Sequence, residues 1–140
     1  EVLEVLEELH LDHLVNRCGG VHGDCDIEQL SAGERQRLAI GRVVVHRPKL
    51  AVLDEATASL DAKLENICYR LLKRRCGKLI SVGHRFSLLQ FHDRVLRGHG
   101  KGQWTQMSRA EYLAQRSLVV DVDLDDKSLD RAISISTDQL

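Results

Sequence analysis

The sequence predicts an α/β fold, in which a layer of strands packs against helices. Residues 49–53 and 79–82 are short apolar runs with the length and composition of buried strands. Between them, residues 62–74 place apolar side chains at helical spacing. Strands that alternate with helices in this way are typical of layered α/β domains.

Composition sets the first limits on function. A chain of 140 residues with 43% hydrophobic residues can form one domain, or a piece of one. The formal net charge of −1 provides no basic field for nucleic acid. No apolar run approaches the roughly 20 residues that a membrane span needs, and no signal-peptide pattern is present. Because residue 1 is not methionine and lies in a helical pattern, we expect an excerpt from a longer protein.

The four cysteines form no C-x-x-C pair, a distribution that predicts reduced thiols in a cytosolic compartment. Together with nearby histidines, two of them suggest a zinc site as an alternative, but the spacings match no common site. We therefore expect no metal there. The residues concerned are His10, His13, Cys18, His22 and Cys25.

The first part of the chain predicts two helices. Residues 1–15 carry an apolar stripe at helical spacing, and residues 18–26 form a glycine-containing loop. A second helix is expected to begin at Ser31, because Ser31 and Glu34 have the spacing of a capping box. Pro48 is expected to end it.

After the second strand, the pattern predicts a short helix at residues 86–91 and a strand at 94–96. A glycine turn then leads to an expected edge strand at residues 103–107, followed by a helix that Ser108 and Glu111 cap.

Residues 117–140 are acidic and rich in serine and threonine, which predicts a flexible, solvated tail. A calcium loop starting at Asp121 is the alternative for this segment. It fails because Asp126 replaces the required glycine and Ala132 the required glutamate.

Polar residues follow both predicted central strands. In doubly wound α/β proteins, ligands bind beyond the carboxyl ends of the strands. Asp54 and Glu55 end the first strand and His84 follows the second. The carboxylate pair has the form of a Walker B segment, in which one acid helps to hold Mg²⁺ and the other orients a water. His84 is placed to contact a terminal phosphate. The alternative for each residue alone is a solvated strand end.

Ser31 and Gly33 begin the predicted helix, where free amides and the helix dipole favour a phosphate. Glycine at position 33 leaves room for one to approach. The alternative is an ordinary capped helix without a ligand.

Together these motifs resemble the ATP-binding cassette (ABC) family, over about residues 1–115. LSAGERQ (residues 30–36) is similar to its signature and LAVLDE (50–55) to its Walker B segment. SLD (59–61) is similar to its D-loop, and His84 to its H-loop histidine. The resemblance implies part of a P-loop NTPase-like (RecA-like) core, with part of the ABC helical subdomain at the N-terminus.

The implied domain is a C-terminal part of a nucleotide-binding domain at residues 1–116, followed by the tail. Within it, residues 1–48 form the helical and signature segment, and residues 49–116 run from Walker B to the H-loop. The phosphate loop G-x-x-x-x-G-K-[ST] occurs nowhere in the chain, and neither does the glutamine loop.

The resemblance also implies cofactors, roles and partners. ATP and Mg²⁺ are the expected cofactors, and a second ABC nucleotide-binding domain, identical or not, is the expected partner. The signature would act on the partner's ATP, and Walker B and the H-loop on this domain's own. The implied catalytic residues are Glu55 and His84; the implied ATP-binding residues are Ser31, Gly33, Glu34, Gln36, Asp54 and Asp61, with Asp54 holding Mg²⁺ through water.

Finer features resemble the D subfamily of ABC transporters and its bacterial relatives. They are the stretch ISVGHRFSLLQFHDRVL and the following GHGKGQW, whereas Asp26 and Gly41 depart from the subfamily pattern. The subfamily implies a transmembrane domain in the same or a partner chain, with the ATPase on the cytosolic face of the membrane. In a eukaryote, that membrane would be peroxisomal (for fatty acyl-CoA) or lysosomal (for cobalamin).

Two other functions stay open. One is a related ABC ATPase that acts on nucleic acid or ribosomes, although Ala56 after Glu55 and the sequence ERQR at 34–37 favour the transporter. The other is a truncated, catalytically silent module that pairs with a complete domain. Whichever function applies, we expect the isolated chain to bind ATP poorly, because the phosphate loop is absent.

Overall fold

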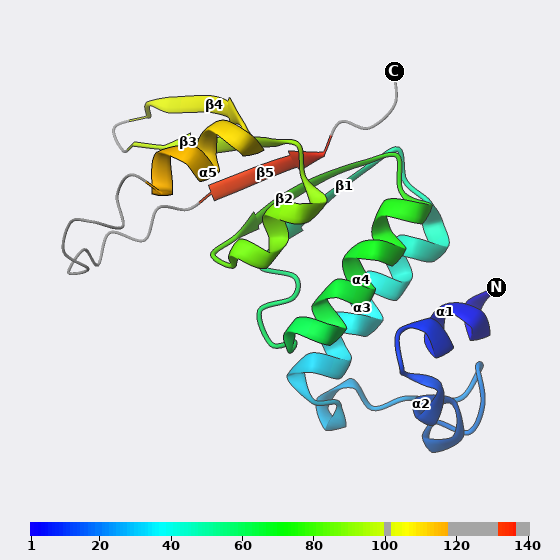
Figure 1. Cartoon of the computed structure of the whole chain (residues 1–140). Helices are drawn as coiled ribbons and strands as arrows, with labels where there is room; N and C mark the ends of the chain where they lie inside the picture. Colours follow the sequence, from blue (N-terminus) through cyan, green and yellow to red (C-terminus); the bar gives the residue numbers. More distant parts are fainter. Residues whose placement is uncertain (100–101, 118–131, 137–140) are drawn as a thin grey trace. The chain divides into compact units, whose positions relative to one another are not determined.

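The computed structural model describes residues 1–99, 102–117 and 132–136, and the chain divides into two compact units. Unit 1 comprises residues 1–51 and 56–77, and unit 2 comprises residues 52–55 and 78–140. The α/β fold is confirmed. Helices are interspersed along the described chain with the strands of one five-stranded sheet (Figure 1).

Unit 1 is helical. Its elements are α1 (Val2–Glu8), α2 (Asp12–Arg17), the short 3-10 helix η1 (Ile27–Gln29), α3 (Ala32–His46) and α4 (Ala62–Arg75). The start of strand β1 (Leu50–Asp54) also belongs to it. Helices α3 and α4 lie side by side (Figure 1).

The single helix expected at residues 1–15 is wrong, because the structure breaks it into α1 and α2. His10 takes a left-handed backbone conformation with φ of 55°, which ends the first helix. The turn buries Leu9 and Leu11 completely, on either side of the break. Burial of two leucines stabilises the fold by several kcal/mol, more than the roughly 1–2 kcal/mol cost of one left-handed residue.

Helix α3 begins and ends as the sequence predicts. The Glu34 amide donates to Ser31 Oγ over 3.2 Å, and the Ser31 amide donates to Glu34 Oε2 over 2.8 Å. These reciprocal bonds confirm the capping box. The helix ends at His46, with Arg47 in a left-handed conformation before Pro48.

The core of unit 1 lies where α1, α3 and α4 meet. Gly41 in α3 is buried, and a Cβ atom there would lie 3.1 Å from Leu9 Cδ1. Glycine at this position therefore lets α1 approach α3 closely, which gives a packing reason for the departure from the subfamily pattern. Other buried core side chains are Val5, Ile40, Val44, Cys68, Tyr69, Leu71 and Leu72.

The prediction of four reduced thiols is wrong for one pair. The structure joins Cys18 to Cys25 in a disulfide that closes the loop before η1. Cys68 and Cys76 are free and buried. Among the described residues, no group of three or more histidine, cysteine, aspartate or glutamate side chains is placed to hold a metal ion.

Unit 2 is built on the sheet. After the end of β1 come β2 (Lys78–Gly83), the 3-10 helix η2 (Phe86–Phe91), β3 (Arg94–Gly98), β4 (Trp104–Ser108), α5 (Arg109–Ser117) and β5 (Ala132–Ser136). The strand order is β1-β2-β5-β3-β4, so β4 is the edge strand that was expected. The capping box of α5 also forms, because the Ser108 amide donates to Glu111 Oε2 over 2.7 Å.

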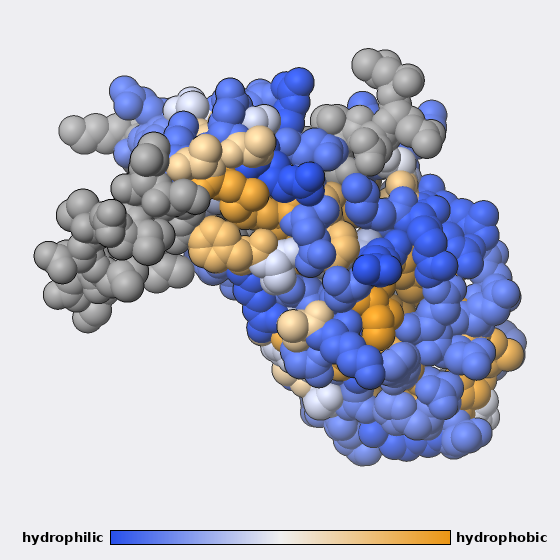
Figure 2. All heavy atoms as spheres, in the orientation of Figure 1, coloured by the Kyte–Doolittle hydropathy of each residue, from blue (hydrophilic) through white to orange (hydrophobic). Residues whose placement is uncertain are grey.

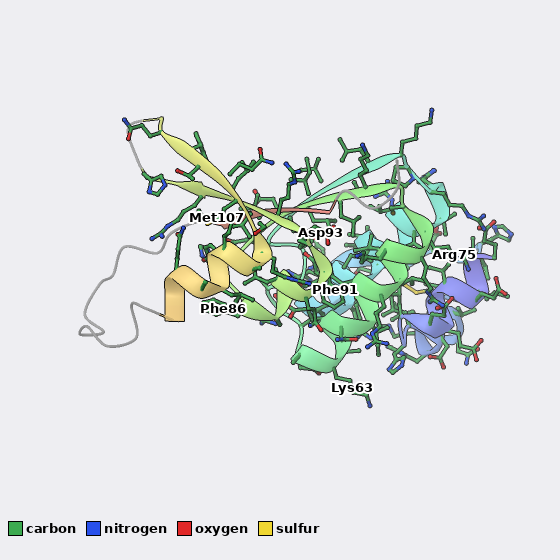
Figure 3. All side chains as sticks on the ribbon, turned by 45° about the horizontal axis from the view of Figure 1, so that its top comes forward. Lys63, Arg75, Phe86, Phe91, Asp93 and Met107 are labelled. Carbon is green, nitrogen blue, oxygen red and sulfur yellow. A yellow bond between two sulfur atoms is a disulfide. The ribbon has the colours of Figure 1, made fainter. Side chains whose placement is uncertain are left out.

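A small hydrophobic core holds η2, the β3–β4 hairpin and α5 together. It consists of Leu89, Val95, Met107 and Tyr112. Figure 2 shows hydrophobic side chains gathered near α5 and η2, and Figure 3 places Met107 on β4 and Phe91 on η2.

Strand β5 comes from the segment that was expected to be a flexible tail. It pairs antiparallel with β2 on one side and with β3 on the other. Ile80 on β2 pairs with Ile135, and Leu96 on β3 pairs with Ile133. At least these five residues therefore belong to the sheet. The rest of the expected tail, including most of the rejected calcium loop, lies outside the described residues. No helix in the described part of the chain is long and apolar enough to cross a membrane.

Candidate functional site

The ends of β1 and β2 bring Glu55 and His84 together. His84 Nε2 lies 3.0 Å from Glu55 Oε1, within hydrogen-bonding distance. The backbone holds the pair in place, because the Glu55 amide donates to the Val82 carbonyl over 2.9 Å. The side chains are partly open to solvent, at 45% for Glu55 and 34% for His84. The two polar strand ends therefore converge, as the strand pattern predicts.

Glu55 also has an unusual backbone. Its φ of 45° lies in the left-handed region, which a side chain with a Cβ atom rarely adopts. Such strain costs about 1–2 kcal/mol and is found most often at functional sites. Here the strained residue is the one that holds His84.

Asp54 ends β1 directly before Glu55 and is exposed, whereas Leu53 before it is buried. An exposed carboxylate oxygen is a ligand type that Mg²⁺ accepts, directly or through water. The chemistry at this strand end thus fits the metal that the sequence implies.

In unit 1, Glu34 connects the start of α3 to α2. Glu34 Oε1 lies 2.9 Å from His13 Nε2 and 3.7 Å from Arg17 Nη1. The pKa of Glu34 is lowered to about 2, first by the hydrogen bond to His13 and then by those from the Ser31 amide and hydroxyl. The carboxylate therefore stays charged at neutral pH, and it joins the N-cap residue of α3 on one side to α2 on the other.

Gly33 lies against the segment that was compared with the D-loop. A Cβ atom at Gly33 would meet Leu60 Cδ2 at 3.4 Å and the Ser59 carbonyl oxygen at 3.5 Å. Those are ordinary van der Waals distances, so alanine fits here and a larger side chain meets the turn. The space left by this glycine faces the protein's own turn at Ser59 and Leu60.

Gln36 and Asp61 have partners inside the chain. Gln36 Oε1 accepts a hydrogen bond from the Ser59 amide over 2.9 Å. Asp61 is the N-cap of α4, and its Oδ1 accepts the Leu64 amide over 2.9 Å. Together with Glu34, these side chains shape the loop and helix ends that the sequence assigns to ATP.

Sequence reasoning missed three residues that support the site, Thr57, Glu65 and His13. Thr57 Oγ1 donates to the buried Glu65 carboxylate over 3.1 Å, and His13 holds Glu34. Helical spacing assigned neither an interior nor a site role to Glu65, because an acid in the first turns of a helix is usually solvated.

The predicted site residues fall into two clusters. Asp54, Glu55 and His84 belong to unit 2, and Ser31, Gly33, Glu34, Gln36 and Asp61 belong to unit 1.

Comparison with known proteins agrees with these motifs. Residues 1–58 match the family described as ABC transporter. The mouse lysosomal cobalamin transporter ABCD4 is 44% identical over 106 residues, which are 74% of this chain and 18% of that protein. An uncharacterized ABC transporter ATP-binding protein of Haemophilus influenzae is 42% identical over 106 residues, again 74% of this chain and 18% of that protein. The chloroplastic ABC transporter D family member 2 of Arabidopsis thaliana is 38% identical over 97 residues, 69% of this chain and 14% of that protein.

Two solved structures show the fold. A putative cobalt transport ATP-binding protein (cbiO-2, ST1066) superposes with a TM-score of 0.63 at 19% identity, over 99% of this chain and 52% of that one. The ATP-binding cassette MJ1267 in its ADP conformation gives a TM-score of 0.57 at 23% identity, over 85% of this chain and 47% of that one. The chain thus spans about half of these cassettes and less than a fifth of the transporters above. It belongs to the ABC transporter family, as part of an ATP-binding domain similar to those of the D subfamily and its bacterial relatives.

Proposed function

We propose that this chain is the signature-to-H-loop part of the ATPase that drives an ABC membrane transporter. The observation that carries the proposal is the pair of Glu55 and His84, 3.0 Å apart at the ends of neighbouring strands. The family hydrolyses ATP, and this pair supplies a carboxylate and an imidazole where ligands bind in α/β sheets.

ATP with Mg²⁺, when bound, supplies the phosphoryl group that passes to water. Asp54, whose carboxylate is exposed, would help to hold the Mg²⁺. A Glu55 oxygen accepts a hydrogen bond from the attacking water and then its proton. His84 Nε2 lies at hydrogen-bonding distance from Glu55 in this structure, and its single N–H would turn from Glu55 to a terminal phosphate oxygen when ATP is bound.

Ser31 and Gly33 would serve a second nucleotide, held by the phosphate loop of a partner ABC domain. The start of α3 offers backbone amides and the positive end of the helix dipole. The family resemblance, in which the signature acts on a partner's ATP and Walker B on the domain's own, supports assigning the two clusters to separate sites. The partner domain is the same protein or a related one, paired with a transmembrane domain.

If the protein is eukaryotic, the resemblance to the D subfamily supports a transporter of a peroxisomal or lysosomal membrane, with the ATPase on the cytosolic face. One relative is a lysosomal cobalamin transporter, but the part of this chain that matches it belongs to the ATP-binding domain. We therefore propose a membrane-transport motor and leave its substrate unassigned. No nucleic-acid partner is proposed.

A graft tests the proposal: this chain replaces the 106 aligned residues of mouse ABCD4, with that relative's own sequence as the control. We expect the graft to bind ATP and to hydrolyse it, whereas the 140-residue chain alone binds ATP no tighter than millimolar. Micromolar affinity of the chain alone, measured by calorimetry, would contradict the assignment of the phosphate cradle to another segment. ATP binding without any turnover in the graft would favour the catalytically silent module instead.

A further inference from the structure

The Thr57–Leu60 turn follows the Walker B segment and leads into α4. The Leu60 amide donates to the Thr57 carbonyl over 3.0 Å, which closes the turn. Thr57 and Leu60 are each only 3% exposed. Both ends of the turn are therefore buried in unit 1.

Helix α4 holds this turn through a buried carboxylate. Glu65 is 1% exposed, and its Oε2 accepts the Thr57 hydroxyl hydrogen bond over 3.1 Å. Removing a carboxylate from water costs several kcal/mol unless polar partners replace the water. A position that needed only packing would therefore be filled more easily by an apolar side chain. The polar choice indicates that the orientation of the turn matters.

Helix α3 holds the same turn from its other side. Gln36 Oε1 accepts the Ser59 amide over 2.9 Å, and Gly33 leaves the space against which Ser59 and Leu60 lie. The turn is thus fastened to the signature helix at Ser59 and to α4 at Thr57. Its geometry relative to Gly33 depends on both fastenings.

The charge of Arg37 also lies close to this arrangement. Burial raises the pKa of Cys68 to about 12, and the charges of Arg37 and Glu65 act on the same thiol in opposite directions. Arg37 Nε donates to the Gly33 carbonyl over 3.3 Å.

We propose that Thr57 and Glu65 are positioning residues, which lock the Ser59–Asp61 segment to Gln36 so that signature and D-loop segments present one rigid surface to a partner's nucleotide. The proposal rests on the proposed function and adds a role for a pair outside the motifs. Neither residue contacts a reacting atom in this account. Their effect passes through the position of Ser59.

Amide hydrogen exchange of the 140-residue chain, followed by NMR at Ser59, tests the lock directly. Thr57→Val keeps the shape of the side chain but removes the hydroxyl donor, so we expect Ser59 exchange to accelerate by about tenfold or more. Thr57→Ser keeps the donor and should stay within about threefold of the wild type. Unchanged Ser59 exchange in Thr57→Val, or equal acceleration in both variants, would overturn the proposal.

Lys63→Gln provides the matched control. Lys63 lies in the first turn of α4, near Glu65 in sequence, but is exposed and extends away from the protein (Figure 3). Its removal should leave Ser59 exchange unchanged. If Lys63→Gln accelerates exchange as much as Thr57→Val, the effect comes from general fraying of α4 and the lock is refuted. Glu65→Gln, which keeps an oxygen acceptor, should fall between Thr57→Ser and Thr57→Val.

The same variants in the ABCD4 graft test the link to turnover. We expect Thr57→Val to lower kcat for ATP by about tenfold with KM within twofold, and Thr57→Ser to restore kcat. A loosened Ser59 amide with unchanged kcat would contradict the positioning role. If the unmodified graft binds but never hydrolyses ATP, the proposed function fails, while Ser59 exchange still decides whether the lock exists.

Discussion

His84 Nε2 lies 3.0 Å from Oε1 of Glu55, and Glu55 makes this contact from a backbone with φ of 45°. The strained residue is also fastened by its amide to Val82 of the neighbouring strand. The hydrogen bond to β2 thus helps to hold the Glu55 backbone in a conformation that residues with a Cβ atom rarely adopt. Backbone strain of this kind clusters at functional sites, where the surrounding structure holds a side chain in the orientation that the chemistry needs.

The left-handed backbone of Glu55 predicts that glycine at this position is more stabilising than alanine. Glu55→Gly and Glu55→Ala both remove the contact with His84, but only alanine keeps the Cβ atom that the left-handed conformation disfavours. We expect the glycine variant to be more stable by about 1 kcal/mol. Urea denaturation of the two variants measures the difference. Equal stabilities, or a more stable alanine variant, would show that φ at residue 55 is relaxed.

Gly77 is required by close backbone contact. A Cβ atom there would lie 2.7 Å from the Lys49 carbonyl oxygen, while the Gly77 amide donates to the Pro48 carbonyl over 3.0 Å. Because the obstacle is backbone, Gly77→Ala should destabilise the chain by about 1–3 kcal/mol. Gly33→Ala is the control, since its Cβ meets only ordinary contacts, and it should change the free energy of unfolding little. A neutral Gly77→Ala would contradict the described connection before β1.

Glu34 makes stability depend on acid pH. Its pKa in the folded chain is lowered from 4.5 to about 2, mainly by the hydrogen bond to His13. The stabilisation is therefore fully present above about pH 4.5 and is lost as the pH falls towards 2. Glu34→Gln should show a shallower loss of stability over this range, measured by denaturant titration at several pH values. His13→Ala should move the loss to higher pH, and a wild-type slope in both variants would rule out Glu34 as its source.

Much of the fold could be predicted because its signals are local. The Ser31 capping box, the stop near Pro48 and the apolar runs of β1 and β2 each need only a few neighbouring residues. The break at His10 could not be read, because the helical stripe continues across it and the gain comes from burying Leu9 and Leu11. Local pattern does not contain that tertiary balance.

Strand β5 escaped prediction for a different reason. Its isoleucines alternate with small residues, so the segment resembles a polar tail more than a strand. Its place between β2 and β3 depends on backbone pairing with strands at least 35 residues away in the sequence. The nearest pair is Arg97 with Ala132. Sequence pattern alone does not report such distant pairing.

For the candidate site, strand ends predicted that Glu55 and His84 meet, because polar residues after neighbouring strands share one edge of a sheet. The hydrogen-bond partners of individual side chains could not be predicted in the same way. Gln36 accepts the Ser59 amide and Glu65 is buried against Thr57, and both depend on helices packing around one turn.

Single-turnover ATP hydrolysis by the ABCD4 graft carrying Glu55→Gln tests the central claim most directly. If Glu55 accepts the proton of the attacking water, hydrolysis should fall by about 100-fold or more while ATP affinity stays within about threefold. Glu111→Gln, an equivalent change at the cap of α5, should keep at least about half of the rate, because only a modest local capping effect is removed. Hydrolysis by Glu55→Gln near the unmodified rate would contradict the account.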